Sequence, residues 1–182
     1  MAKTSIYVTF DRVDENTGAG KVCLHEINAL KKVTNLKRVL TGPEISEKIG
    51  QHYPFIPYLY DYFAADLLED YSSVDIAHLS CSPANSIIRK INPKRILVNV
   101  VAHDLKLSIE EHERVTKQAY PFVHNTDPYL HQVLLKHARR ADVVFTPSEN
   151  SARWIRENIN PKRIEVIPHG TDLPPTVPEP PI

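Results

Sequence analysis

The chain has 182 residues, 42% of them hydrophobic and 24% charged, which is the composition of a globular protein rather than a disordered or fibrous one. Its 22 basic and 22 acidic residues give a formal net charge of zero, which argues against a nucleic-acid-binding protein because binding needs an excess of basic residues. The two cysteines, Cys23 and Cys81, lack metal-ligand spacing and cannot form a dense disulfide framework, which favours a reducing, cytoplasmic location. No apolar run approaches the roughly 20 residues of a transmembrane helix, and the N-terminus shows no secretory signal.

Short apolar segments rich in β-branched residues alternate with helical patterns along the chain. The predicted strands are residues 5–10, 36–41, 74–79, 95–101, 142–146 and 163–167, and the predicted helices are residues 19–33, 58–70, 128–140 and 148–159. Several strands are apolar throughout, a pattern typical of strands buried on both faces and hence of parallel sheets. The alternation predicts a single Rossmann-like α/β domain: a mostly parallel open sheet of about six or seven strands, with helices on both faces.

The C-terminal end of the chain is unusually rich in proline. The chain has 15 prolines against five glycines, and six of the prolines lie at position 168 or beyond. We therefore expect one folded domain over residues 1–172, followed over residues 173–182 by a Pro-rich tail or the start of an interdomain linker.

Two other segments stand out. Residues 85–96 and 150–164 share a pattern in which Asn-Ser begins a helix and Asn-Pro-Lys-Arg leads into a strand; we interpret it as a common helix-to-strand connection rather than a binding motif. Residues 51–63 are dense in aromatic side chains. We interpret this stretch as an irregular segment and a helix packed on the sheet, with an acceptor-pocket wall or a membrane-touching patch as the alternatives.

Ligands of open α/β sheets bind beyond the carboxyl ends of the strands. This rule selects residues 11–21, 80–85, 102–104 and 147–150. The first of these stretches holds Gly18, Ala19, Gly20 and Lys21, which lack the outlying Gly and the Ser or Thr of a P-loop and the third Gly of a dinucleotide fingerprint. The glycines indicate either a tight strand-to-helix turn or a helix N-terminus that approaches an oxygen-rich or anionic ligand.

His103 and Asp104 follow a buried strand and are the predicted catalytic pair. A histidine there could accept a proton or bond a hydroxyl near neutral pH, and the aspartate could orient it or bind a sugar hydroxyl; a helix cap beside a satisfied histidine is the alternative. His78 and Ser148 also lie near strand ends. No His, Cys and carboxylate cluster has zinc spacing, so no metal is expected.

Four stretches together resemble the retaining glycosyltransferases of the GT-B fold, the sucrose-synthase and mannosyltransferase-like family (glycosyltransferase family 4 type). They are the loop 18–21 with the helix residues 24–30, the strand end 100–104, the segment 141–151, and the Ile-Pro-His-Gly-Thr-Asp run within 163–172. The stretches occur in the order of the family, and the resemblance covers nearly the whole chain.

The resemblance implies an acceptor-side domain that helps to move a sugar from a nucleotide-sugar donor to a sugar or other hydroxyl acceptor, with retention and without a cofactor. A C-terminal domain would hold the donor through a Glu-x7-Glu signature, and no such motif follows Asp172, so we expect the chain to be inactive alone. Peripheral membrane contact is compatible with this assignment. The implied catalytic residues are His103 and Asp104, and the implied substrate-binding residues are Gly18, Ala19, Gly20, Lys21, His78 and Ser148.

Two other functions remain as hypotheses. One is a stand-alone, non-catalytic module that binds sugars or nucleotides with the same fold. The other is an NAD-type oxidoreductase, which the missing third glycine and the missing acid after the second strand disfavour.

Overall fold

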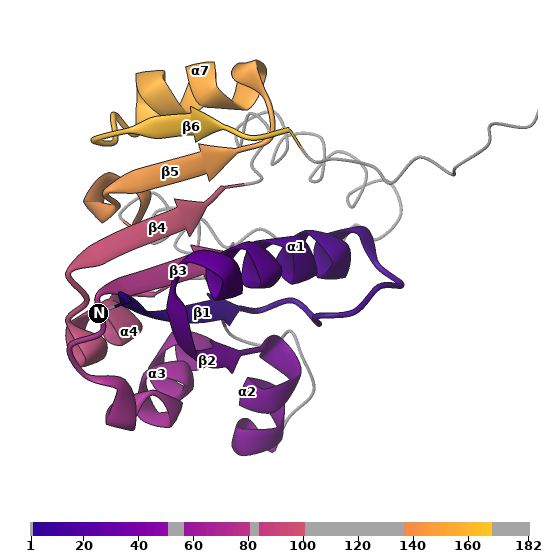
Figure 1. Ribbon diagram of the computed structural model, residues 1–182, viewed down its shortest axis with the longest axis vertical. Coiled ribbons are helices and arrows are strands. Elements are labelled where there is room, and N and C mark those ends of the chain that lie inside the picture. Colours follow the sequence, from indigo (N-terminus) through magenta and orange to yellow (C-terminus); the bar gives the residue numbers. More distant parts are fainter. Residues whose placement is uncertain (1, 51–56, 81–83, 101–136, 169–182) are drawn as a thin grey trace, which may run out of the picture.

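A computed structural model of the protein describes residues 2–50, 57–80, 84–100 and 137–168 (Figure 1). Six strands form one sheet in the order β2-β1-β3-β4-β5-β6, and every described pair of neighbours is parallel. The strands are β1 (Thr4–Thr9), β2 (Asn35–Leu40), β3 (Ile76–Ser80), β4 (Arg95–Asn99), β5 (Val143–Thr146) and β6 (Ile164–Val166). The predicted parallel open sheet is confirmed, and each predicted strand overlaps an observed one.

The helices lie between the strands in the sequence. They are α1 (Gly18–Val33), α2 (Gly42–Ile49), α3 (Pro57–Leu67), the short 3-10 helix η1 (Glu69–Tyr71), α4 (Asn85–Ile91) and α7 (Glu149–Asn158). Of the predicted helix 128–140, only residues 137–140 are described, and they are helical. The aromatic residues 51–56, the strand end at Val101 and the tail 173–182 lie outside the described residues.

Helix α2 was missed by the sequence analysis, although its ends carry ordinary signals. Pro43 lies in its first turn, where a missing backbone N–H costs nothing. Gly50 ends it in the left-handed conformation, with φ of 70°, which a residue without Cβ adopts easily. The helix is only eight residues long, too short for its apolar periodicity to be recognised.

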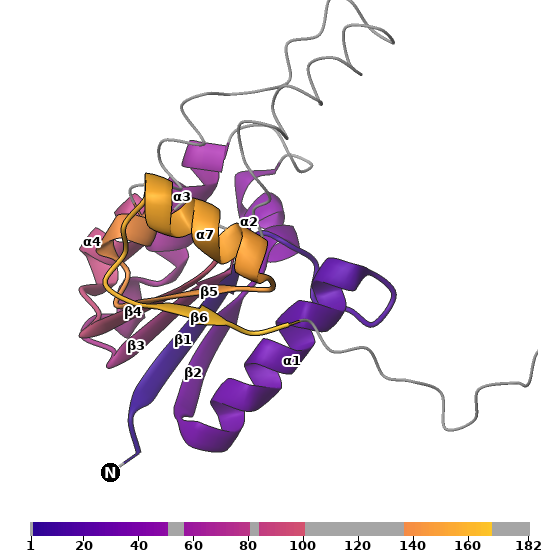
Figure 2. The same cartoon turned by 90° about the horizontal axis from the view of Figure 1, so that it is seen from above.

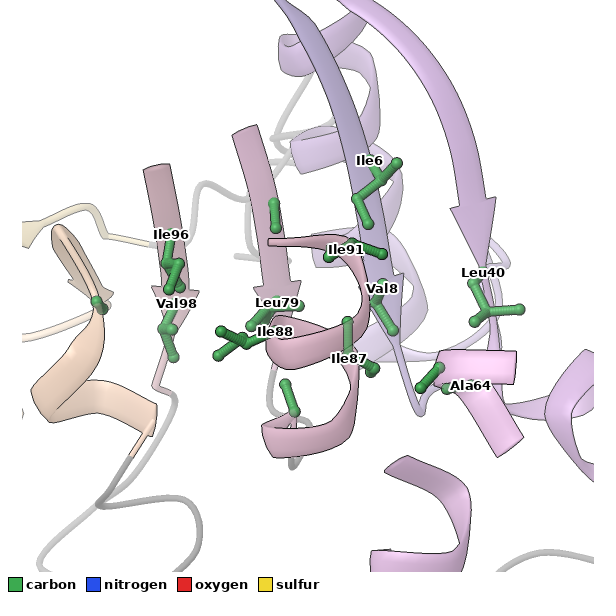
Figure 3. Packing of buried hydrophobic residues seen from close by; sticks show 14 of the residues in the cluster. Ile6, Val8, Leu40, Ala64, Leu79, Ile87, Ile88, Ile91, Ile96 and Val98 are labelled. Carbon is green, nitrogen blue, oxygen red and sulfur yellow. The ribbon is translucent and has the colours of Figure 1, made fainter. Parts of the chain in front are cut away.

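The two faces of the sheet differ in composition. Figure 2 shows α1 on one side of the sheet and α3, α4 and α7 on the other. The second side holds a large aliphatic cluster, in which Ile6 and Val8 of β1 pack with Leu79 of β3 and with Ile87 and Ile91 of α4 (Figure 3). Burying each such side chain contributes about 1.5–3 kcal/mol, so this layer provides most of the core.

The face covered by α1 is much more polar. Side chains alternate between the two faces of a strand, so the neighbours of the aliphatic residues point toward α1. They include several buried polar or aromatic groups: Ser5, Tyr7 and Thr9 on β1, His78 and Ser80 on β3, and Asn99 on β4. Among the described residues, the buried members of the apolar cluster on this face are Tyr7, Cys23, Ile27 and Leu30. Most of the buried polar side chains carried by the described strands therefore lie on this side of the sheet.

The repeated Asn-Pro segment is a connection, as the sequence analysis inferred. Asn92 and Asn160 both follow a helix with positive φ, 42° and 51° respectively, and the next residue is proline in each copy. The lysine after that proline donates to the aspartate that precedes a strand (Lys94 to Asp75 at 2.7 Å, Lys162 to Asp142 at 3.0 Å). Both copies thus pin the start of a strand in the same way.

Candidate functional site

The glycine-containing turn before α1 is closed by its own side chains. Thr17 accepts a hydrogen bond from the Gly20 amide at 3.0 Å, and Asp14 accepts from the Thr17 amide at 3.1 Å. A Cβ on Gly20 would lie 2.4 Å from the Asp14 carbonyl oxygen, whereas one on Gly18 would meet nothing within 4 Å. Gly20 is therefore required by the tight turn, which is one of the two readings that the sequence left open.

Gly18, Ala19 and Lys21 are exposed around this turn. None of them lines the pocket described below, so the structure does not bring this loop together with His78. Of the described residues, a ligand at this loop would meet the N-terminus of α1 and these exposed side chains.

A pocket of about 520 Å³ lies between α1 and the sheet; we call it the α1 pocket. This volume is typical of a small-molecule site. Its described lining comes from one flank of α1, from β3, β4 and β5, and from the residues after β6: Val22, His25, Glu26, Ala29, Leu30, Val33, His78, Leu97, Asn99, Phe145, Thr146, Ile167 and Pro168. Asn99 and Thr146 are the last residues of their strands, so the pocket reaches the carboxyl edge of the sheet, where ligands of this fold class bind.

Four residues form a buried polar cluster in this region, the Glu26 cluster: Tyr7, Glu26, His78 and Asn99. The Tyr7 hydroxyl donates to Glu26 Oε2 at 2.6 Å, and Asn99 Nδ2 donates to Glu26 Oε1. His78 Nε2 lies 3.5 Å from Glu26 Oε2. The carboxylate of a helix residue is thus surrounded by groups from three adjacent strands.

The contacts of this cluster set its protonation. Burial raises the pKa of Glu26, but its contacts with His78, Tyr7 and Asn99 outweigh burial and hold that pKa below its usual value. Burial and the neighbouring Glu26 charge raise the pKa of Tyr7 far above its usual value. Glu26 is therefore an ionised acceptor at neutral pH and Tyr7 a protonated donor.

His78 is fixed by packing on both sides of its ring. The ring stacks on Phe145 with centroids 5.9 Å apart and packs at a tilt on Tyr7 at 5.0 Å. Its side chain is 7% exposed, and Nε2 is buried without a hydrogen bond. The structure thus places this predicted site residue in the α1 pocket, with Nε2 directed at the Glu26 carboxylate.

The other predicted residues lie elsewhere. Ser148 is the N-cap of α7, where its hydroxyl accepts from the Ser151 amide at 3.2 Å, and it does not line the α1 pocket. His103 and Asp104 lie outside the described residues.

Sequence reasoning missed three members of the Glu26 cluster: Tyr7, Glu26 and Asn99. A signal was present, because Glu26 falls between Cys23 and Ile27 on the buried stripe of α1, where an unpaired charge would be costly. Its partners could have been sought only among polar residues that alternate with apolar ones on the strands.

Within the described ranges, no group of three or more His, Cys, Asp or Glu side chains is arranged to hold a metal ion. No helix in that part of the chain combines the length and apolarity that crossing a bilayer requires.

Comparison with known proteins assigns the family. Residues 22–174 match the family model described as Glycosyltransferase Family 4. The chain belongs to this family. The match confirms the resemblance stated above and supports glycosyltransferase-type function, with a sugar donor and an acceptor as partners. It includes Glu26, His78 and Asn99, whereas the loop Gly18 to Lys21 lies before it. A search of curated proteins found no match.

Proposed function

We propose that the chain is the acceptor-side domain of a hexosyltransferase that moves a sugar from a nucleotide-sugar donor to a hydroxyl acceptor with retention. The observation that carries the proposal is the family match over residues 22–174. It is supported by a parallel sheet whose carboxyl edge carries buried polar side chains beside a pocket. Fold alone would not be enough, since one fold hosts many functions.

His103 and Asp104 are the proposed catalytic pair. In the sequence they follow β4, whose last residue, Asn99, lines the α1 pocket. In the proposed role, His103 accepts a hydrogen bond or a proton from a hydroxyl of the transferred sugar or the acceptor. Asp104 orients that histidine or bonds a second hydroxyl.

The remaining site residues are proposed to bind substrate. The first turn of α1, with Gly18, Ala19, Gly20 and Lys21, would face the donor phosphates, because helix N-termini favour anionic groups. His78 would contact a substrate hydroxyl from the α1 pocket, and Ser148 would do so from the start of α7.

The donor is proposed to be held by a second, C-terminal domain, as in the proteins that this chain resembles, with the folded unit here spanning residues 1–172 and acting in the cytoplasm. The alternative is a non-catalytic module that binds a sugar or nucleotide by itself.

The test is a transfer assay with a panel of UDP-, GDP- and ADP-sugars, which detects released nucleoside diphosphate and the anomer of the product. It is run on the chain as it is and on the chain joined to a donor-binding domain of the same family. We expect turnover only in the joined protein and its loss in His103→Ala, with His112→Ala as the matched control. Unchanged turnover in His103→Ala would remove that residue from the site, and tight sugar binding without turnover in either protein would favour the binding module.

A further inference from the structure

The walls of the α1 pocket are mainly apolar. On the helix side they are formed by Val22, Leu30 and Val33, and on the sheet side by Leu97 and Phe145. Val33 is 74% exposed, an unusual environment for a large aliphatic side chain. Apolar walls of this kind stabilise an apolar ligand by removing its surface from water.

The floor of the pocket is formed by Glu26, His78 and Asn99 of the Glu26 cluster, and the Glu26 carboxylate can accept further hydrogen bonds. A carboxylate offers about four lone-pair sites, and the described donors to Glu26 are the Tyr7 hydroxyl and the Asn99 amide. The Glu26 side chain is 18% exposed, so part of it faces the pocket. His78 Nε2 is a second buried polar atom beside the carboxylate, 3.5 Å from Glu26 Oε2.

The charge of the floor restricts the ligand. None of the described residues lining the pocket is lysine or arginine, so an anionic group would face the ionised Glu26 without compensation. The charge of Glu26 would attract a protonated amine, but the amine would lose its hydration among the apolar walls. It would also have to place three donors against the few side-chain oxygen acceptors of the described lining, those of Glu26, Asn99 and Thr146. Burying a hydroxyl costs less free energy than burying a charged group. A hydroxyl can also donate a hydrogen bond to Glu26 while its oxygen accepts one from a neighbouring donor.

We propose that the α1 pocket binds an uncharged, mainly apolar molecule through a hydroxyl group that donates to Glu26 beside His78. This inference rests on the proposed function and deepens it, because His78, proposed above to contact a substrate hydroxyl, lines this pocket. Probe binding is measured without sugar transfer, so the failure of this inference can be distinguished from the failure of the proposed function. By the same chemistry, the described lining of this pocket disfavours phosphate-bearing ligands, including the diphosphate of a nucleotide sugar.

The test uses four probes of nearly equal size: benzyl alcohol, toluene, benzylamine and benzoate. Each is titrated into the labelled protein while the methyl signals of Val22 and Leu97 are followed by NMR. We expect benzyl alcohol to shift these signals and to bind on the order of tenfold more tightly than toluene, which lacks the hydrogen bond to a charged acceptor. Binding of toluene, benzylamine or benzoate as tight as that of benzyl alcohol would overturn the proposal, as would shifts confined to other parts of the protein.

Two variants assign the effect to the pocket. Glu26→Gln keeps the shape of the side chain but removes its charge, and we expect benzyl alcohol to bind on the order of tenfold more weakly. Glu47→Gln is the matched control, because Glu47 is exposed on α2, and it leaves binding unchanged. Equal affinity in wild type and Glu26→Gln would refute the role of the carboxylate.

A third variant tests whether benzyl alcohol binds in the α1 pocket even if Glu26→Gln does not fold. Ala29 is exposed on α1 and lines the pocket, so Ala29→Phe places a bulky side chain in the pocket while keeping all four residues of the Glu26 cluster. We expect an unchanged melting temperature and at least tenfold weaker benzyl alcohol binding. Unchanged binding in this folded variant would mean that the probe binds elsewhere.

Discussion

His137 makes the stability of the domain depend on pH. The side chain is almost fully buried, and the Ala84 amide at the start of α4 donates to its Nδ1 at 2.9 Å. A ring nitrogen that accepts a hydrogen bond must be unprotonated. Burial, with a smaller contribution from the positive charge of Arg140, lowers the pKa of His137 from 6.5 to about 4.

The sign and size of the effect follow from this difference. Between pH 6.5 and about 4 the unfolded chain binds a proton that the folded chain excludes, so the free energy of unfolding falls as the pH falls through this window. At about 1.4 kcal/mol for each pH unit, the whole window corresponds to a loss of roughly 3 kcal/mol. Above pH 6.5 and below about pH 4, the protonation of His137 is the same in the folded and unfolded chain, so His137 adds no pH dependence to the free energy of unfolding.

The perturbation is His137→Gln, whose amide oxygen can still accept from Ala84 but does not titrate. Urea unfolding followed by circular dichroism at pH 7, 5.5 and 4 gives the free energy of unfolding at each pH. We expect wild type to lose roughly 3 kcal/mol more than the variant between pH 7 and pH 4. His25→Gln, at an exposed position on α1, is the control and should keep the pH dependence of wild type. The reasoning is refuted if His137→Gln and wild type lose stability in parallel.

Three further predictions concern α1, α7 and the Glu26 cluster. Gly20→Ala places a Cβ 2.4 Å from a backbone oxygen and should lower the free energy of unfolding by about 1–3 kcal/mol. Gly18→Ala places its Cβ in open space and should not destabilise the protein. Equal urea midpoints for the two variants would contradict this prediction. Ser148→Ala removes the α7 cap and should cost about 0.5–2 kcal/mol, largely restored in Ser148→Asp, and a thermal melt that cannot distinguish the two variants would count against the cap. Tyr7→Phe removes a donor to the Glu26 carboxylate and should raise the pKa of Glu26, as measured by carbon-13 NMR titration of its carboxyl signal; an unmoved or lower pKa would show that the hydroxyl does not stabilise the charge.

Much of the fold could be predicted from local pattern. The strands carry short β-branched runs, and α1 and α7 carry apolar stripes with polar caps, so neighbouring residues were sufficient to identify them. The short α2 was missed because its capping signals, Pro43 and Gly50, frame too few residues to show a period.

The candidate site could be predicted only in part, for a physical reason. His78 stood out because a histidine near the end of a strand is unusual in a buried run. Glu26 did not stand out, because its environment is created by Tyr7 and Asn99, which are distant in sequence and meet it only when α1 packs on the sheet. Such a cluster is a property of the packed layers rather than of any one segment.

The unequal faces of the sheet also bear on how the chain finds its correct strand pairing. Sliding β3 or β4 by one residue would turn every side chain of that strand over, moving His78 or Asn99 into the aliphatic layer and Leu79 or Val98 out of it. Each polar group buried in the aliphatic layer without a hydrogen bond would destabilise the misaligned sheet by about 1–3 kcal/mol. The side chains that form the polar floor of the α1 pocket therefore also destabilise misaligned strand pairings. Replacing them with aliphatic residues would reduce the difference in free energy between the correct and the misaligned sheet.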